Sequence, residues 1–303
     1  MKTTILLLAL APAVLADLVR DVRGLTANGD FAAAERLVTA FQKEHGATPE
    51  MILGYSWIAR GAHAAKRWDD AERYAAETRR LCEAALKSRP LDAEPKLPLA
   101  LGASIEVMGH ALAGSGRRSE AVAFLRRELA AWRDTSIRTR IQKNIHMLSL
   151  EGQPAPALDV REYLGDRPAP LARLKGKPVI LFFWAHWCPD CKQQKPVLER
   201  LLQEFAAQGL TLVGPTQRYG YVAAGRDAPP AEELAYIDRI RKEFYGSLPM
   251  TVPVSEENFR NYGSSTSPTL VVLDRAGKVV LYNPGKMTYE ALLPAVKRAA
   301  GGD

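Results

Sequence analysis

The chain has 303 residues, of which 47% are hydrophobic and 8% aromatic, and 41 lysines and arginines face 34 aspartates and glutamates. This composition fits a soluble folded protein with a net charge of +7 at pH 7. The basic excess is mild and no basic run with interleaved aromatic residues occurs, which excludes nucleic acid as the expected partner.

The N-terminus has the layout of a secretory signal peptide, which we place at residues 1–16. A positive start at Lys2 is followed by an apolar stretch that ends on small residues at Ala16. The stretch is interrupted by Pro12 and is shorter than the roughly twenty residues of a membrane span. No cysteine lies near its end to carry a lipid. We therefore predict a periplasmic or secreted protein, with an uncleaved membrane anchor as the alternative.

Residues 17–150 are predicted to form an all-α domain of helical hairpins. This region is dense in Ala, Leu, Arg and Glu and lacks strand-like alternation. Three stretches place a turn before a small residue, at Ala34, Ala71 and Ala121, and they resemble the second-helix start of tetratricopeptide-type repeats. Their intervals of 37 and 50 residues are irregular, so we expect divergent hairpins that bind a protein partner, or else a generic helical bundle. Cys82 is expected to be a buried small hydrophobe.

Two cysteines separated by two residues lie where a predicted strand passes into a predicted helix. Lys177–Trp184 is rich in β-branched and aromatic residues, and Lys192–Ala207 has apolar residues at helical spacing. Unpaired N–H groups and the positive end of the helix dipole favour an anion at a helix start, so Cys188 is suited to become a thiolate. We predict a redox dithiol in which Cys188 is exposed and Cys191 is buried. Pro189 also suits the first helical position, because the N–H that it lacks has no helical partner there.

A metal site and a pair of core cysteines are the alternatives to a redox dithiol. Zinc normally needs four ligands, whereas the chain has one further cysteine and no His-x-x-x-His run. Copper is conceivable because His186 lies beside Cys188, but nothing else supports it. Core burial does not explain Pro189. We therefore expect no metal and no cofactor other than a redox-active Cys188–Cys191 disulfide.

The C-terminal half carries further motifs around the dithiol. Gly152–Pro156 reads Gly-Gln-Pro-Ala-Pro, and Ser267, Pro268 and Thr269 precede an apolar strand. With the dithiol, these motifs resemble the thioredoxin superfamily, and most of all the secreted or membrane-tethered disulfide reductases of the TlpA and ResA types. The resemblance implies an α/β thioredoxin fold for residues 151–303, behind a linker at Glu151–Pro156 that stops the last helix.

The resemblance also implies a cis peptide bond before Pro268. A cis peptide bond costs little energy only before a proline. Because proline lacks an N–H, the backbone of Ser267 is free to bind an extended substrate. The alternative is a trans proline that opens a strand. We expect Trp187, Pro189, Ser267 and Pro268 to contact the substrate.

Two acids that such proteins use for proton transfer are absent. Phe182 stands where thioredoxins carry a buried aspartate, and Gln194 stands where ResA-type proteins carry a glutamate. Proton transfer then relies on water or on His186, Asp190 or Lys192, which we expect to tune the dithiol.

The charges beside the dithiol are expected to disfavour the thiolate modestly. Asp190 places a negative charge at the helix start, whereas His186 is mostly neutral near pH 7 and Lys192 is expected to be solvated. A peroxiredoxin, the nearest enzymatic rival, resembles the chain less. That family requires a proline and a threonine or serine where Leu181 and Ala185 stand.

The remaining elements of the C-terminal half alternate between strands and helices. Tyr219 and Tyr221 lie in a polar loop and either flank the active site or pack on the surface. The expected elements are a strand at Leu210–Val213, that loop at Arg218–Pro230, a helix at Ala231–Tyr245, a hairpin at Leu270–Asn283 and a helix at Tyr289–Arg298.

The sequence thus favours an enzyme, a thiol-disulfide oxidoreductase that reduces disulfides of protein clients. Export implies an oxidising compartment, where a dithiol needs an external thiol or electron donor to stay reduced. The alternatives are a helical-repeat binding or scaffold protein with a vestigial redox domain, and a disulfide oxidase or isomerase.

Overall fold

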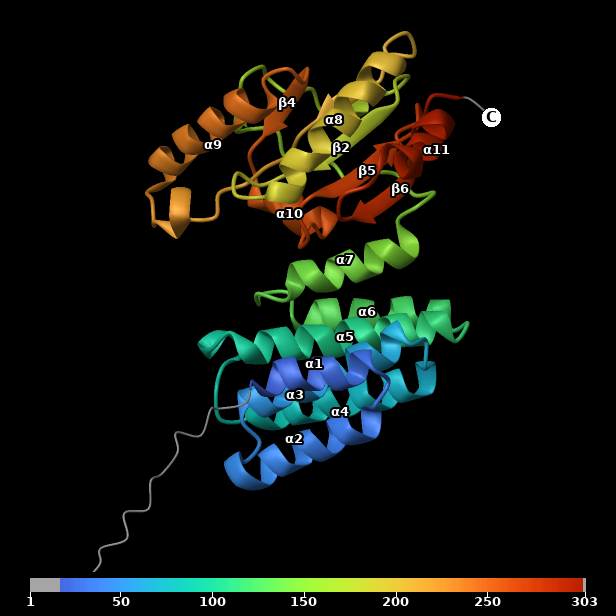
Figure 1. Ribbon diagram of the computed structural model, residues 1–303. Coiled ribbons are helices and arrows are strands. Elements are labelled where there is room, and N and C mark those ends of the chain that lie inside the picture. Colours follow the sequence, from blue (N-terminus) through green and yellow to red (C-terminus); the bar gives the residue numbers. More distant parts are fainter. Residues whose placement is uncertain (1–16, 302–303) are drawn as a thin grey trace, which may run out of the picture. The chain divides into compact units, whose positions relative to one another are not determined.

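The computed structural model describes residues 17–301 (Figure 1). The signal peptide predicted for residues 1–16 lies outside the described residues. The chain divides into two compact units, residues 1–107 and 108–303. This division falls inside helix α5, whereas the sequence places the domain boundary between residues 150 and 151. Helices α6 (Arg118–Ala131) and α7 (Arg138–Ser149) therefore belong to the second unit.

The described part of the first unit is helical, as predicted. At three helix starts the side chains of Asp17, Asp30 and Thr48 accept a hydrogen bond from the backbone N–H three residues on, at 3.2, 2.9 and 3.3 Å. Each cap satisfies a donor that a helix start leaves unpaired. The elements are α1 (Leu18–Ala27), α2 (Phe31–His45), α3 (Pro49–Ala64), α4 (Trp68–Leu86), the short 3₁₀ helix η1 (Leu91–Ala93) and the first part of α5 (Lys96–Gly114).

The turns before α2, α4 and α6 (Arg118–Ala131) share one backbone feature. The φ angles of Gly29, Lys66 and Gly116 are +79°, +57° and +87°, in the left-handed region that glycine adopts most readily. The alanines that follow, Ala34, Ala71 and Ala121, are fully buried. Turn and buried alanine agree with helical hairpins, while membership of the tetratricopeptide family stays a prediction.

Among the described helices, α5 has the length and composition of a membrane span. A window of 18 of its residues is 61% buried. The core helix of a soluble protein passes the same test, so this finding is weak evidence for a membrane.

Cys82 lies on α4 and is fully buried, as predicted. Burial, with smaller contributions from Glu83 and Glu94, raises the pKa of its thiol to about 12. Because the thiolate is the reactive form, the oxidised native protein is expected to take up no iodoacetamide, and the urea-unfolded protein one equivalent. Intact-mass spectrometry before and after unfolding checks this. Native alkylation within minutes would contradict the burial of Cys82.

The second unit is built on a six-stranded sheet in the order β1-β4-β3-β2-β5-β6. The strands β2, β3 and β4 run parallel, and β1, β5 and β6 pair antiparallel to their neighbours. The observed strands are β1 (Tyr163–Leu164), β2 (Val179–Phe183), β3 (Thr211–Val213), β4 (Met250–Pro253), β5 (Thr269–Leu273) and β6 (Val279–Pro284). This mixed sheet confirms the predicted α/β class and the predicted β5–β6 hairpin.

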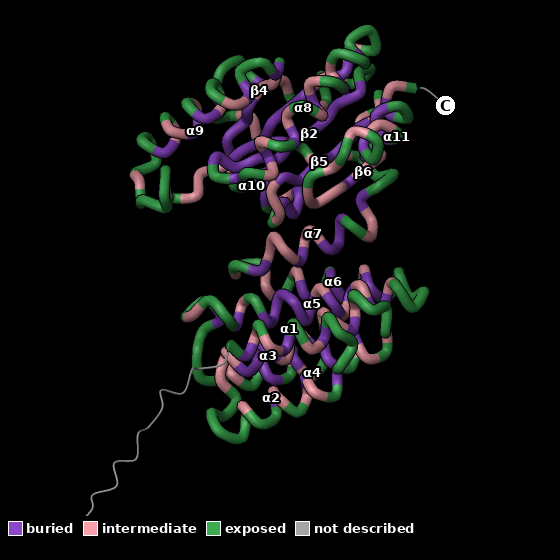
Figure 2. Tube along the Cα trace, viewed as in Figure 1, coloured by how far each residue is buried: buried purple, intermediate pink, exposed green. Residues whose placement is uncertain are grey.

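Helices cover both faces of the sheet, so β2 is buried on both sides (Figure 2). Ile180 and Phe182 pack in a core cluster with residues of α8, α9 and α11, whereas Val179, Leu181 and Phe183 pack in a second cluster with residues of α10. This alternation follows from the two-residue period of a strand. The helices are η2 (Leu171–Leu174), α8 (Pro189–Glu204), η3 (Ala223–Gly225), α9 (Pro230–Tyr245), α10 (Glu256–Tyr262) and α11 (Tyr289–Ala299).

Helix α7 (Arg138–Ser149) packs against α10 and β6 of this unit. The Nε2 atom of His146 lies 2.8 Å from the backbone carbonyl of Asn261, and its ring meets that of Tyr282 edge-on at 5.5 Å. Leu150, just after α7, belongs to the core cluster beside α10. This helix, which the sequence assigns to the helical domain, is therefore packed on the sheet-containing part of the chain.

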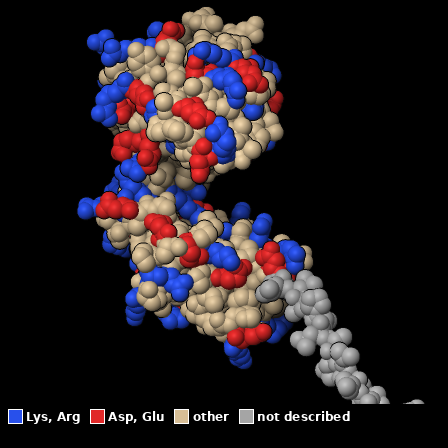
Figure 3. All heavy atoms as spheres, turned by 90° about the vertical axis from the view of Figure 1, so that its left-hand side faces the viewer, with Lys and Arg blue, Asp and Glu red and all other residues tan. Residues whose placement is uncertain are grey.

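Charged side chains of both signs are interspersed over the face shown in Figure 3. Elsewhere the charged side chains also form pairs that are exposed to water, such as Arg80 with Glu77 in the first unit at 2.6 Å. Exposed pairs of this kind contribute at most about 1 kcal/mol each to stability. The buried clusters around the sheet therefore dominate the stability of the second unit.

Candidate active site

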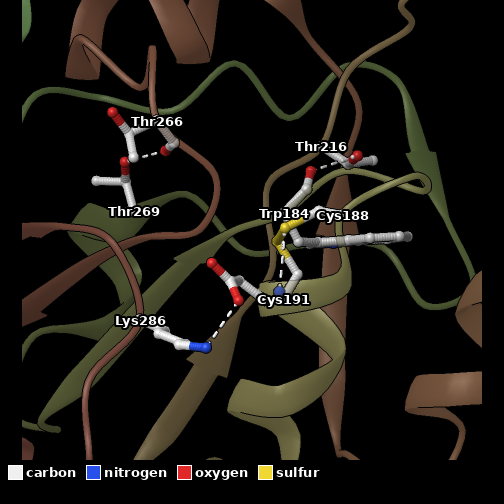
Figure 4. The surroundings of a disulfide bond; sticks show 8 residues. Trp184, Cys188, Cys191, Thr216, Thr266, Thr269 and Lys286 are labelled. Carbon is white, nitrogen blue, oxygen red and sulfur yellow. Dashed lines mark hydrogen bonds and ion pairs between the residues drawn. A yellow bond between two sulfur atoms is a disulfide. The ribbon is translucent and has the colours of Figure 1, made fainter. Parts of the chain in front are cut away.

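Cys188 directly precedes α8 and Cys191 lies in the first turn of that helix, and the two form a disulfide with their Cα atoms 5.3 Å apart (Figure 4). Cys188 is the N-cap residue of α8, and its sulfur accepts a hydrogen bond from the backbone N–H of Cys191 at 3.0 Å. Pro189 occupies the first turn of the helix. The helix start thus directs a backbone donor at the sulfur on which a negative charge would develop.

Both cysteines are buried, with exposed fractions of 1% for Cys188 and 0% for Cys191. The expectation that Cys188 is exposed is therefore wrong for the disulfide form, because the sulfur packs into the core cluster around α8. The neighbouring Trp187 has an exposed fraction of 46%. Its ring supplies apolar surface next to the dithiol.

Trp184 fixes the loop that carries the dithiol. Its indole N–H donates to the carbonyl of Gly214 at 3.0 Å, and its own carbonyl accepts from the hydroxyl of Thr216 at 2.9 Å. Trp184 is fully buried and lies beside the disulfide (Figure 4). The loop between β2 and α8 is thereby tied to the segment that follows β3.

The charged neighbours of the dithiol have partners that the sequence did not suggest. Lys286 donates to Asp190 at 2.8 Å and to Gln193 at 2.6 Å, so the Asp190 charge is partly neutralised. Lys192 is half-buried, with its Nζ 3.6 Å from the ring centroid of Phe244. The expectation of a solvated Lys192 is wrong, because its ammonium group stacks on an aromatic ring.

His186 is buried among three tyrosines. Its ring meets those of Tyr219, Tyr221 and Tyr236 edge-on, at centroid distances of 5.6, 5.4 and 5.2 Å. Its Nε2 atom lies 3.4 Å from a carboxylate oxygen of Glu233, which is 1% exposed. Tyr219 and Tyr221 therefore flank this part of the site instead of packing on the surface.

Sequence reasoning missed Glu233. Its carboxylate accepts the backbone N–H groups of Tyr219 and Gly220, at 2.5 and 2.9 Å. It thus anchors the loop of Tyr219 to the start of α9, next to His186. The signal in the sequence is weak, since one more glutamate in the first turn of a helix is also what the helix dipole favours.

The peptide bond between Ser267 and Pro268 is cis, as the resemblance implies. Thr269 follows at the start of β5, directly opposite Phe183 at the end of β2. Ser267 and Trp187 line one cavity of about 230 Å³. The proline loop and the exposed tryptophan beside the dithiol, separated by 80 residues of sequence, thus share one surface.

Comparison with known proteins shows similarity between the C-terminal half of the chain and thiol-disulfide oxidoreductases. Residues 152–282 match the model of the AhpC/TSA family. Two relatives named thiol-disulfide oxidoreductase ResA, from Bacillus subtilis and Halalkalibacterium halodurans, are 29% and 28% identical over 138 and 130 residues. These matches cover 46% and 43% of this chain, and 69% and 66% of the relatives. The C-terminal domain is a thioredoxin-like thiol-disulfide oxidoreductase domain.

A solved structure described as a putative thiol:disulfide interchange protein DsbE from Chlorobium tepidum is also similar to this domain. It is 27% identical, with a TM-score of 0.38, and the match covers 50% of this chain and 98% of that one. Helices α1 to α7 lie outside the segment that the family model matches.

The two positions at which the resemblance implies an acid hold an aromatic and an amide side chain. Phe182 is fully buried, and Gln194 is 1% exposed. The Gln194 side-chain oxygen accepts the N–H of Met287 at 2.8 Å, while its Nε2 has no partner among the described residues. Gln194 therefore ties α8 to the segment before α11. Within residues 17–301, no cluster of three or more His, Cys, Asp or Glu side chains is placed to hold a metal ion.

Two buried histidines are expected to make the stability of the domain depend on pH. Burial lowers the pKa of His186, against the opposing charge of Glu233, and burial likewise lowers the pKa of His146. The unfolded pKa is about 6.5, so below that pH the unfolded state binds protons that the folded state does not. Stability is then present above about pH 6.5 and is lost as the pH falls, by at most about 1.4 kcal/mol per pH unit for each histidine.

Urea unfolding at several pH values checks this expectation. The midpoint should fall between about pH 7 and pH 5 in the native sequence. His146→Gln and His186→Gln should each flatten the decline, because glutamine does not titrate. A midpoint that changes equally with pH in all three proteins would assign the pH dependence to other groups.

Proposed function

We propose that this chain is an exported thiol-disulfide oxidoreductase that reduces disulfides in protein clients through Cys188 and Cys191. The observation that carries the proposal is the disulfide at the start of α8, with the Cys191 N–H donated to the Cys188 sulfur. A backbone donor at a helix start stabilises a thiolate, which is the attacking species in disulfide exchange.

The proposed reaction has two displacement steps. The Cys188 thiolate attacks one sulfur of the client disulfide, so that a mixed disulfide forms and the other client sulfur leaves as a thiolate. The Cys191 thiolate then attacks the Cys188 sulfur, which releases the second client thiol and leaves the Cys188–Cys191 disulfide. An external thiol or electron donor restores the dithiol. Trp187, Pro189, Ser267 and Pro268 are proposed to contact the client.

We propose that the dithiol acts as a reductant. The support comes from the environment of the Cys188 sulfur in the structure, and no longer from the Asp190 charge alone. Lys286 pairs with Asp190 and Lys192 stacks on Phe244, so these charges are engaged with other groups. Burial of Cys188 disfavours a charged sulfur, and the N–H of Cys191 favours it. A strong oxidant requires an unusually stable thiolate. Since burial and the N–H donor act in opposite directions on the Cys188 thiolate, their combined effect supports a reductant.

Equilibration with glutathione buffers tests the direction. We expect a potential nearer to that of thioredoxin, about −270 mV, than to that of a strong disulfide oxidant, about −120 mV. The redox state can be followed by tryptophan fluorescence, since Trp184 and Trp187 adjoin the dithiol. A potential above about −150 mV would favour an oxidase or isomerase.

Export and the role of the helical region belong to the same proposal. The residue pattern of 1–16 supports a periplasmic or secreted location, and helices α1 to α6 are proposed to bind a partner protein. N-terminal sequencing of the protein recovered from the periplasm or medium tests export. Mass spectrometry of proteins trapped on a Cys191→Ser variant identifies clients.

A further inference from the structure

The cavity beside the dithiol is built by five parts of the second unit, one of which is α10 with Glu256, Phe259 and Arg260. Trp187 comes from the active-site loop, Ser264 and Ser267 from the proline loop, and Thr139 from α7. Gln217 and Tyr219 from the loop after β3 complete the wall. We call this cavity the Trp187 pocket. Its volume of about 230 Å³ is below the roughly 300–1,000 Å³ of small-molecule sites, which suits a single side chain of a larger substrate.

Polar atoms in the wall of the Trp187 pocket lack partners. Among the described residues, Oγ of Ser264 and Oε1 of Gln217 lack a well-aligned hydrogen-bond partner, whereas the Tyr219 hydroxyl lies beside the Gln217 and Ser267 side chains. Ser264 is only 6% exposed and lines this cavity, and its hydroxyl is a buried polar group. Buried polar groups are normally hydrogen-bonded. A guest that offers both a donor and an acceptor would satisfy these atoms.

Charged groups at the rim are already paired. Arg260 contacts Glu256 at 2.5 Å within α10, and Arg138 lies 4.0 Å from Glu257. The remaining wall is aromatic, with Tyr219 packed edge-on against Trp187 at 5.5 Å and against Phe259 at 6.5 Å. A pocket with neutral polar atoms and self-neutralised charges favours an uncharged guest over a charged one.

Helix α7 is held firmly enough to form part of a specificity site. His146 lies 2.8 Å from the Asn261 carbonyl. A Cβ atom on Gly263 would lie 2.3 Å from the backbone nitrogen of Lys143, so α7 and the end of α10 are in backbone contact. Thr139 is half-buried on this same helix.

We propose that the Trp187 pocket binds a neutral, hydrogen-bonding side chain next to the cysteine that a client presents, and that α7 supplies part of this specificity through Thr139. The inference rests on the proposed function, because it concerns the substrate of the same dithiol. A carboxamide is the best fit, since its N–H₂ group can donate to the Gln217 oxygen and its own oxygen can accept from the Ser264 hydroxyl. An apolar side chain of equal size would leave these atoms unpaired, which is how polar sites reject apolar analogues.

The test uses the reduced full-length protein and synthetic peptides whose single cysteine is joined by a disulfide to thionitrobenzoate. The Cys188 thiolate attacks the peptide sulfur, the peptide–thionitrobenzoate bond breaks, and the coloured thionitrobenzoate leaves with the electron pair. Two peptide series carry Gln, Leu, Glu or Lys immediately before or after the cysteine. Each rate constant is divided by that of the same protein with the symmetric disulfide of thionitrobenzoate, which has no peptide.

In at least one series we expect the Gln peptide to react about tenfold faster than the Leu peptide, a ratio that corresponds to about 1.4 kcal/mol. The Gln peptide should also react faster than the Glu and Lys peptides. Ser264→Ala and Thr139→Val should each reduce the Gln-to-Leu ratio to about three or less, by removing one hydroxyl. The control Ser88→Ala, at an exposed residue of the first unit, should keep the ratio. Thr139→Val keeps the test decisive if Ser264→Ala fails to fold.

The possible results distinguish failure of the pocket proposal from failure of the proposed oxidoreductase function. Release of thionitrobenzoate without a preference for Gln, or a preference that both pocket variants retain, overturns the pocket and leaves the oxidoreductase intact. No release from any disulfide by the reduced protein overturns the proposed function, and the pocket inference with it.

Discussion

Cys188→Ser is expected to abolish disulfide reduction, and Cys191→Ser to accumulate stable mixed disulfides with clients. The sulfur of Cys188 caps α8 and receives the N–H of Cys191, so it is the sulfur on which the helix start stabilises a thiolate. Cys191 lies one turn further into the helix, where its sulfur reaches the Cys188 sulfur and can resolve the mixed disulfide. An insulin reduction assay gives the first result, and non-reducing gels with mass spectrometry give the second.

The third cysteine supplies the matched control. Cys82→Ser removes a buried thiol far from the dithiol in sequence and should keep the turnover of the native protein. Normal turnover by Cys191→Ser would show that Cys191 does not resolve the mixed disulfide. Mixed disulfides on Cys188→Ser instead would reverse the two roles.

The elements closest to the dithiol could be predicted because their signals are local. The apolar run of β2, the helical spacing of α8 and the proline after Cys188 all lie within one short stretch of sequence. The predicted and observed strands agree to within two residues at Lys177–Trp184 and Val179–Phe183. The short elements β4 (Met250–Pro253) and α10 (Glu256–Tyr262) were not predicted, because such short segments are too brief to show a hydrophobic periodicity.

The contacts that surround the dithiol could not be predicted, because they join distant parts of the chain. Lys286 contacts Asp190 across 96 residues of sequence, and this pairing weakens the effect that the sequence argument assigned to the Asp190 charge. Glu233 reaches the loop of Tyr219 across 14 residues. Neither the residue types nor their spacing in the sequence predicts such pairs, because the two partners become neighbours only in the folded chain.

The packing of α7 is the largest departure from the sequence-based division of the chain. Composition groups α7 with the helices before it, because an amphipathic helix gives the same pattern whichever surface covers it. The contacts with α10 and β6, and the place of Thr139 in the Trp187 pocket, associate α7 with the redox domain. A fragment that begins at Glu151 would therefore lose one wall of the pocket as well as the Leu150 contact with the core.

Two glycines that both have a positive φ angle and the same turn hydrogen bonds allow the α7 contact to be tested in the full chain. Gly263 follows α10 with φ +61°, and Gly116 follows α5 with φ +87°. In both turns the glycine N–H bonds to the carbonyl three residues back, and the next N–H bonds to the carbonyl five residues back. The space around them differs, because nothing lies within 4 Å of a Cβ on Gly116, whereas a Cβ on Gly263 would meet the backbone of Lys143.

Gly263→Ala is therefore expected to destabilise the protein by about 2–4 kcal/mol, and Gly116→Ala by about 1 kcal/mol. Both variants place an alanine in the left-handed region, which costs about 1 kcal/mol, and Gly263→Ala adds overpacking of about 1–3 kcal/mol against α7. Urea unfolding measures the difference, and the Gln-to-Leu ratio of peptide rates reports whether α7 has shifted at the Trp187 pocket. Equal losses of stability in the two variants would show that α7 does not rest on α10 in solution, and Thr139 could then have no part in selecting the client.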